Sequence, residues 1–206
     1  MLESLYDKFK KWSDGGSVYV YSDPHFSDLD SYKLRFPDAY KSVTDYNEFI
    51  NKLDKMQINN INKMCNKCDT LVILGDIGNV ECVKKLKAGR KILIMGNHDC
   101  GASNYKGDNL FDEVYEGPLF IGKRILLSHE PIDFDFALNI HGHLHFKEEL
   151  KSDNCSFNVC AEHINYTPVN LKDILNSGIM KDIKDIHRDT IDDAIIRKLK
   201  RNEEVK

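Results

Sequence analysis

Short apolar runs that each end in Asp, Asn or His restrict the fold of this chain more than any other feature. The runs TLVIL at 70–74 and ILIM at 92–95 show no polar alternation, which predicts strands that are buried on both faces. A helical pattern at 80–87, closed by Gly89, lies between them. Strands that alternate with helices in this way predict βαβ units and a largely parallel sheet.

Helix and strand patterns flank this central part on both sides. Apolar residues recur at helical spacing from Leu2 to Trp12, and a strand pattern, VYVY, follows. A long helix is expected to begin after Thr44 as its N-cap and to run to about Cys65. After Gly117 the strand patterns lie closer together, which predicts hairpins and antiparallel strands. The predicted fold class is therefore α/β, a sandwich with mixed sheets.

A chain of 206 residues is long enough for one well-filled core, and we expect one main domain at 1–170. Residues 171–206 are predicted to form a helical extension with an apolar stripe at Ile179, Ile183, Ile186, Ile191, Ile195 and Leu199. The preferred interpretation is that this extension packs on the same domain. A homo-oligomer formed through the C-terminal helix is the alternative.

The composition excludes some classes of protein. With 41% hydrophobic and 30% charged residues, the chain is typical of a globular protein in water, and no apolar run approaches the roughly 18 residues of a membrane span. The first residues, MLESLYDKFKKW, lack the apolar segment of a secretion signal, so we expect a cytoplasmic protein without a membrane partner. The formal net charge of −4 weighs against nucleic acid as a partner, although a local basic groove stays open.

The six cysteines are expected to be reduced. Cys65 and Cys68 form a C-x-x-C pair, but no second pair completes a zinc site, and Cys65 continues the apolar face of the predicted helix. A structural role for this pair is therefore preferred to a zinc or redox role.

Polar side chains follow the apolar runs at the points where the predicted strands end. Because functional groups in α/β sheets collect beyond the carboxyl ends of the strands, we expect these side chains to converge on one site. Glycine directly before several of them allows a sharp turn and a close approach of the backbone to a ligand. Each residue alone is a weak signal, and the joint pattern carries the prediction: Asp23, His25, Asp76, Asn97, His98, Asp99, His129, His141, His143 and His145.

These sequence blocks, in this order, resemble the calcineurin-like metallophosphoesterase superfamily. The matching blocks are D-x-H at 23–25, G-D at 75–76, G-N-H-D at 96–99, the strand-end His129 and G-H-x-H at 142–145. The resemblance implies a four-layer α/β/β/α sandwich with two mixed β-sheets, a catalytic domain at 1–170, and a dinuclear metal centre at the sheet ends.

The resemblance also implies the ligands of two divalent metal ions. Asp23, His25 and His145 correspond to one ion, and Asn97, His129 and His143 to the other, with Asp76 as the bridge. Mixed imidazole and oxygen ligands suit Mn, which is favoured, and also Fe, Zn, Ni or Co. The absence of a cysteine among these residues speaks against a closed structural zinc site.

The implied activity is the hydrolysis of a phosphate ester by a hydroxide that bridges the two metals. His98 is expected to assist the leaving group and Asp99 to hold the His98 ring, while Arg35 is a candidate for binding the substrate phosphate. Strand alternation should send His143 and His145 to the same side, and His141 is more readily interpreted as a buried strand residue than as a support for the ligands.

Two alternatives stay open. A nuclease or nucleotide phosphodiesterase could use the same metal centre, and a non-catalytic metal-binding scaffold could keep the ligands without the reaction. The substrate, whether a monoester, a diester or a cyclic nucleotide, depends on loops that the motifs do not describe.

Overall fold

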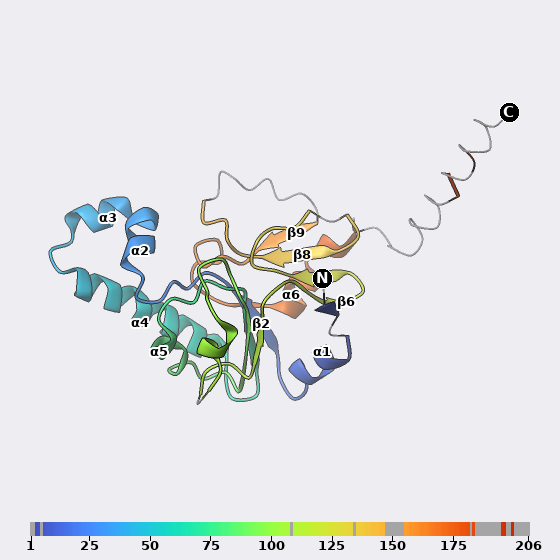
Figure 1. The fold of residues 1–206 in the computed structure, drawn as a ribbon, viewed down its shortest axis with the longest axis horizontal. Coiled ribbons are helices and arrows are strands. Elements are labelled where there is room, and N and C mark those ends of the chain that lie inside the picture. Colours follow the sequence, from blue (N-terminus) through green and yellow to red (C-terminus); the bar gives the residue numbers. More distant parts are fainter. Residues whose placement is uncertain are drawn as a thin grey trace.

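Two five-stranded sheets, with the orders β10-β2-β3-β4-β5 and β1-β6-β7-β8-β9, build the protein (Figure 1). The computed structural model describes residues 3–4, 6–107, 109–133, 135–146, 155–181, 183, 195–196 and 199. The prediction of an α/β fold with two mixed sheets is confirmed.

The first sheet contains the strands that the apolar runs predict. It comprises β2 (Val18–Tyr21), β3 (Thr70–Ile73), β4 (Arg90–Ile94), β5 (Glu113–Tyr115) and β10 (Val169–Asn170). β2, β3, β4 and β5 are parallel, and β10 runs antiparallel beside β2. β3 is buried along its whole length, as expected for a strand covered on both faces.

The second sheet corrects part of the prediction for the region after Gly117. It comprises β1 (Glu3–Ser4), β6 (Leu119–Gly122), β7 (Ile125–Leu127), β8 (Leu138–His141) and β9 (Ser156–Asn158). Only the pair β6 and β7 is an antiparallel hairpin, whereas β7, β8 and β9 are mutually parallel. The chain therefore crosses back after β7, and as a result β7 and β8 deliver their carboxyl ends to the same edge.

Two helices, at 29–35 and 37–42, lie where no helix was predicted, and the others differ from the predicted ones mainly at their ends. They are α1 (Tyr6–Trp12), α2 (Leu29–Arg35), α3 (Pro37–Ser42), α4 (Tyr46–Met64), α5 (Val80–Val83), α6 (Leu171–Asn176) and the 3₁₀ helices η1 (Ala102–Tyr105) and η3 (Ile179–Lys181). The predicted N-terminal helix is shorter, because Glu3 and Ser4 pair with β6 as a strand. The N-cap of α4 is Asp45 and not Thr44, since the Asp45 carboxylate accepts the N–H groups of Asn47 and Glu48.

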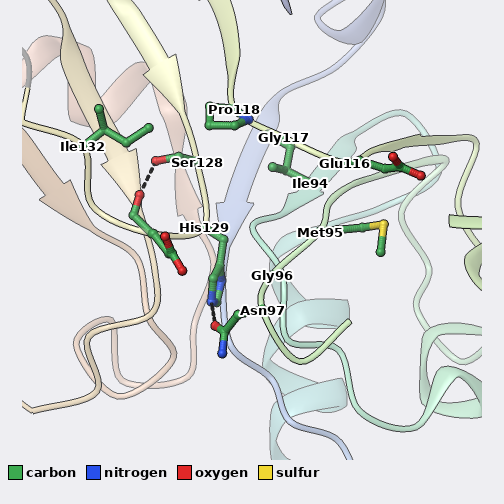
Figure 2. A pocket seen from close by; sticks show the side chains of 11 residues that line it. Ile94, Met95, Gly96, Asn97, Glu116, Gly117, Pro118, Ser128, His129 and Ile132 are labelled. Carbon is green, nitrogen blue, oxygen red and sulfur yellow. Dashed lines mark hydrogen bonds between the residues drawn. The ribbon is translucent and has the colours of Figure 1, made fainter. Parts of the chain in front are cut away.

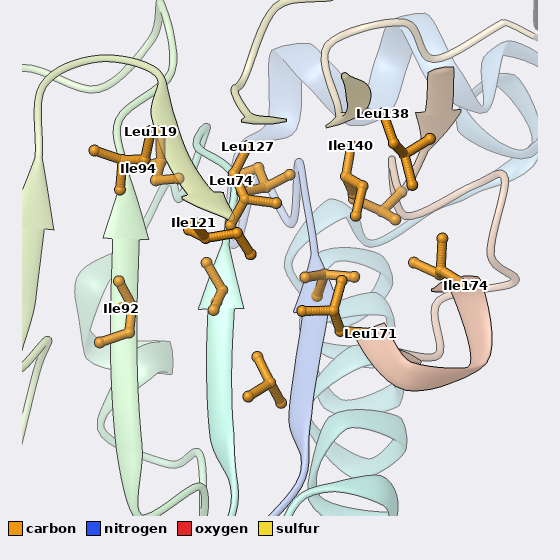
Figure 3. Close-up of a cluster of buried hydrophobic side chains, with 14 of the residues drawn as sticks. Leu74, Ile92, Ile94, Leu119, Ile121, Leu127, Leu138, Ile140, Leu171 and Ile174 are labelled. Carbon is orange, nitrogen blue, oxygen red and sulfur yellow. The ribbon is translucent and has the colours of Figure 1, made fainter. Parts of the chain in front are cut away.

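Side chains of the two sheets meet in a core between them (Figure 3). Val72 of β3 and Leu74, the residue after this strand, lie in this core together with Leu127 and Ile140 of the second sheet. The alternate residues Leu71 and Ile73 point to the other face, where Ile58 and Ile61 of α4 cover them. Both faces of the first sheet are thus packed, and its polar groups are left at the strand ends.

The described part of the C-terminal region packs partly on the core. Leu171, Ile174 and Ile183 are buried in the cluster between the sheets, while Ile195 and Leu199 are exposed. Two other residues of the predicted apolar stripe, Ile186 and Ile191, lie outside the described residues. The domain boundary at 170 and the oligomer contact therefore stay predictions.

In the described part of the chain, no helix combines the length and the apolar character that a membrane span requires.

Candidate metal centre

Parallel strands of both sheets bring the predicted ligands to one place. Asp23, Asp76 and Asn97 follow β2, β3 and β4, whose carboxyl ends lie along the same edge of the first sheet. His129 and His143 follow the parallel strands β7 and β8 of the second sheet. The site therefore forms where the carboxyl ends of two packed sheets meet.

Several of these residues adopt a backbone conformation that is rare for side chains other than glycine. The φ angles of Asp23, His25, Asp76 and His143 are 56°, 44°, 55° and 68°. Such left-handed residues outside glycine are uncommon and gather at functional sites, where the surrounding structure holds them. Because four predicted ligands share this conformation, we infer that the backbone of the loops fixes the directions of their side chains.

One candidate ligand group consists of Asp23, His25 and His145, which offer ligand atoms within 4.8 Å of one another. The Nε2 atom of His145 lies 3.5 Å from Asp23 Oδ1, and the Nε2 atom of His25 lies 4.0 Å from the same oxygen. These are the three residues that the resemblance assigns to one metal ion.

Asp76 lies between His25 and His129, which belong to different predicted ligand sets. Its Oδ2 atom lies 3.4 Å from His25 Nε2 and 3.5 Å from His129 Nε2. Its other oxygen accepts the backbone N–H of His98 at 3.0 Å, which fixes the carboxylate plane. One oxygen of Asp76 thus faces a histidine from each predicted ligand set.

Asn97, His129 and His143 form the second set. Asn97 Oδ1 lies 2.8 Å from His129 Nε2 and 3.1 Å from His143 Nδ1, and the two ring nitrogens are 3.2 Å apart. His129 Nδ1 lies 2.7 Å from the Leu74 carbonyl oxygen, so Nδ1 carries the proton and Nε2 presents a lone pair. The Nε2 lone pair and the Asn97 amide oxygen are both acceptors and repel each other, and a cation bound to both would remove this repulsion.

His25 and His145 are oriented in the same way as His129. The Nδ1 atom of His25 lies 3.1 Å from Asp28 Oδ2, and the Nδ1 atom of His145 lies 3.1 Å from Glu162 Oε2. In each ring Nδ1–H donates to an acceptor, which leaves Nε2 free to coordinate. Burial, as the largest cause, and the nearby Arg35 charge lower the pKa of His25 to about 4, so its ring is neutral at pH 7.

The atoms of the first set fit a divalent ion. Asp23 Oδ1 and His25 Nε2 are buried and have no hydrogen-bond partner among the described residues. Unsatisfied buried polar atoms are costly, and two acceptors that point into one space have no common partner other than a proton or a cation. The residues present therefore suit metal binding.

The loops that carry these ligands leave no room for larger residues. A Cβ atom at Gly142 would collide with the side chains of Ser22 and Asp23, so the chain can pass from β8 to His143 only with glycine there. On the helix side, Gln57 of α4 donates to the Pro24 carbonyl oxygen at 2.9 Å and supports the loop between Asp23 and His25.

His98 lies beside the ligands, but Asp99 does not hold its ring. The His98 ring is 5.6 Å from the His25 ring, centre to centre, in an edge-to-face arrangement. The Asp99 carboxylate instead accepts the backbone N–H groups of Asp76, Ile77 and Gly96 and the Tyr105 hydroxyl. In the described structure it joins the loops after β3 and β4, which corrects the role expected for Asp99.

Arg35 also has contacts that differ from the expected ones. Its Nη1 atom donates to the Asp23 carbonyl oxygen and to Glu162, and its guanidinium lies over the Tyr32 ring. The Nε and Nη2 atoms are buried and have no partner in the described part of the chain. Arg35 is thus anchored to Asp23 and Glu162 through Nη1, and its contact with a substrate phosphate stays a prediction.

The histidines around the HGHLH segment lie differently from the strand alternation expected of them. β8 ends at His141, and the left-handed His143 turns the chain, so His143 and His145 belong to a loop. His141 is buried and its Nδ1 atom contacts the Gly142 carbonyl oxygen at 2.8 Å, in agreement with the structural interpretation. His163 Nε2 lies 2.9 Å from the Leu144 carbonyl oxygen, where it holds the same loop.

Asp28 and Glu162 are site residues that the sequence motifs did not reveal. Asp28 is both the acceptor for His25 and the N-cap of α2, so its position three residues after His25 was the only available signal. Glu162 pairs with Arg35 and His145 across long sequence separations. Burial raises the pKa of Glu162, but the His145 hydrogen bond and the Arg35 charge outweigh it and lower the pKa to about 2.

Cys160 forms a further candidate ligand group with His145 and Glu162, whose ligand atoms lie within 4.8 Å of one another. Cys160 Sγ lies 3.2 Å from Glu162 Oε2, and burial raises the pKa of this thiol far above its ordinary value, so it stays protonated and donates to the carboxylate. Cys65 is buried, with its pKa raised to about 12 by burial, whereas Cys68 is exposed. These environments agree with a structural role for Cys65.

Two pockets flank the centre. One, of about 260 Å³, opens on the Asn97 and His129 side between Ile132 and Met95 (Figure 2). The other, of about 440 Å³, is lined by His25, His98 and His145. Each predicted ligand set therefore borders a pocket.

Comparisons with known proteins agree with this geometry. The family described as calcineurin-like phosphoesterase matches residues 16–203. A crystal structure of a protein of unknown function, AQ665 from Aquifex aeolicus, is similar with a TM-score of 0.59 and 27% sequence identity, covering 78% of this chain and 98% of that chain. No curated protein matches the sequence.

Proposed function

Because the chain belongs to the calcineurin-like phosphoesterase family, we propose that it is a divalent-metal-dependent hydrolase that cleaves a phosphate ester. The observation that carries this proposal is the Asp76 Oδ2 atom, which lies 3.4 Å from His25 Nε2 and 3.5 Å from His129 Nε2. A single carboxylate oxygen between two imidazole lone pairs is suited to two adjacent cations.

Asp23, His25 and His145 would hold one ion, Asn97, His129 and His143 the other, and Asp76 would contact both. When bound, a pair of such ions neutralises charge on the phosphoryl oxygens and makes water a nucleophile at neutral pH. Manganese is the proposed metal, since carboxylate, amide and imidazole ligands all suit it, and Fe, Zn, Ni and Co are the alternatives.

The protein's own groups would orient the ligands and handle the leaving group. Asp28, the Leu74 carbonyl and Glu162 keep three imidazoles in the tautomer that coordinates through Nε2. In the reaction the ester P–O bond breaks, a water oxygen forms the new P–O bond, and the departing oxygen takes up a proton. His98, on the pocket side of His25, is the proposed donor of that proton.

A substrate panel on metal-reconstituted protein tests this function. The protein is stripped with a chelator, reloaded with each metal, and assayed on phosphomonoesters, phosphodiesters and single-stranded nucleic acid. We expect metal-dependent turnover that Asp76→Asn and His98→Ala lower by about 10² to 10⁴-fold. Lys55→Ala, an exposed change on α4, is the matched control and should keep full activity.

Two results would contradict the proposal. One is the absence of turnover with every metal, and a protein that still binds metal in that case would be the non-catalytic scaffold. The other is full activity in both Asp76→Asn and His98→Ala. Exclusive cleavage of nucleic acid would instead identify the nuclease alternative.

A further inference from the structure

The pocket beside His98 has a composition that bears on the substrate. Its volume is about 440 Å³, within the range of small-molecule sites. His25, His98 and His145 line it, and the His25 ring lies 5.6 Å from the His98 ring and 5.2 Å from the His145 ring, centre to centre. A group bonded to phosphorus on this side of the centre would extend into the pocket.

Two exposed apolar side chains form part of the wall of this pocket. Leu34 of α2 is 73% exposed and Phe146, in the loop after β8, is 54% exposed. Single exposed apolar residues are common, but these two come from distant parts of the sequence and line the same cavity. An apolar ligand ring would remove both from water, which favours binding in proportion to the apolar area covered.

The charges around the pocket disfavour a leaving group with a phosphate of its own. Asp28 and Asp30 contribute carboxylates to the lining. Arg35 is the single Lys or Arg among the described lining residues, and its charge is paired with the Glu162 carboxylate through Nη1, although its Nε and Nη2 atoms have no partner among the described residues. Lys33, on the same helix, is bonded to Asp30 at 2.9 Å. An additional phosphate would therefore meet two carboxylates, while the charge of the one Lys or Arg among the described lining residues is balanced by Glu162.

We propose that this pocket receives the leaving group of the ester, and that this group is a compact planar ring without an additional phosphate. The substrate class is thus a phosphate ester of an aryl or arylmethyl alcohol, and not a nucleoside polyphosphate or a nucleic acid. The leaving-group role of the pocket rests on the proposed function. Binding of a ring in the pocket can be measured without turnover.

The test compares benzylphosphonate with ethylphosphonate, two non-hydrolysable probes that differ in the ring. Calorimetry on metal-loaded protein is expected to show about tenfold tighter binding of benzylphosphonate, the difference that burial of a ring can supply. Leu34→Ser and Phe146→Ser should each remove most of this preference. Met64→Ser, an equally apolar exposed position at the far end of α4, should leave it unchanged.

A second probe tests the charge argument. Because the lining carries Asp28 and Asp30, 4-carboxybenzylphosphonate should bind several-fold more weakly than benzylphosphonate. Turnover of benzyl phosphate against ethyl phosphate gives the kinetic counterpart, with the preference expressed mainly in KM.

The outcomes separate the two proposals. Equal binding of both phosphonates, a preference that survives in Leu34→Ser and Phe146→Ser, or tighter binding of the carboxylated probe would overturn the pocket proposal. A retained preference in a protein that hydrolyses no ester would overturn the proposed function and the leaving-group role, and would keep the pocket as a binding site for a planar ring. Circular dichroism on each variant establishes that the exposed substitutions leave the fold intact.

Discussion

Three imidazoles at the centre are oriented in the same way: Nδ1 of each ring contacts a hydrogen-bond acceptor, which leaves Nε2 free. The acceptors are the Asp28 carboxylate, the Leu74 carbonyl and the Glu162 carboxylate. The candidate ligands follow from their positions in the sequence motifs. The acceptors do not, because a carboxylate or a carbonyl at a given position carries no sign of which ring it will meet.

Replacement of Glu162 tests whether the acceptor at Nδ1 of His145 orients this ring for metal binding. Glu162→Ala removes the acceptor for His145 and leaves Arg35 without its partner, so we expect the affinity for manganese to fall by about 10 to 100-fold. Calorimetric titration of chelator-treated protein measures this change. Glu48→Gln, exposed in the first turn of α4, is the control, and an unchanged affinity in Glu162→Ala would contradict the positioning role.

At the scale of elements, the residues directly after β8 form a close contact between the second sheet and the first. The Gly142 backbone passes so close to Ser22 and Asp23 that a Cβ would overlap both side chains. The same Asp23 carboxylate accepts the His143 backbone N–H at 2.8 Å, so this contact joins the two sheets at two of the candidate ligands.

Gly142→Ala should therefore disturb both stability and metal binding. We expect a loss of about 1 to 3 kcal/mol in the free energy of unfolding, because the added methyl group must displace Ser22 or Asp23. Urea denaturation measures the loss, and a metal titration measures the effect on Asp23. Gly117→Ala is the matched control, since a Cβ there meets nothing within 4 Å. Equal stability of the two variants would rule out the close approach.

At the scale of the whole molecule, metal binding should couple to folding. The site draws ligands from both sheets, and a metal that binds only the folded state stabilises it by mass action. With free metal at about 100 times its Kd, the expected gain is about 2.7 kcal/mol. Thermal denaturation with manganese and with chelator checks this, and Asp76→Asn should show a much smaller difference. A melting temperature that is independent of metal in the unaltered protein would contradict the coupling.

The apolar runs and the residues that end them determined the buried strands of the first sheet and the set of candidate ligands. Strand burial follows from local composition, and β3 and β4 lie where TLVIL and ILIM predict them. The order of the sequence motifs also predicted the family, and the match of the calcineurin-like phosphoesterase family to residues 16–203 confirms that prediction.

Only the tertiary structure decided what surrounds the ligands. It paired Glu162 with Arg35 and His145, bonded Asp99 to the loops after β3 and β4, and placed His143 in a left-handed turn instead of a strand. It also brought Leu34 and Phe146 to one pocket. Most of these contacts join residues from different segments of the chain, and their partners are set by how the two sheets pack and where the crossing loops return. Local patterning restricts which residues are buried, but it does not specify which distant side chains meet.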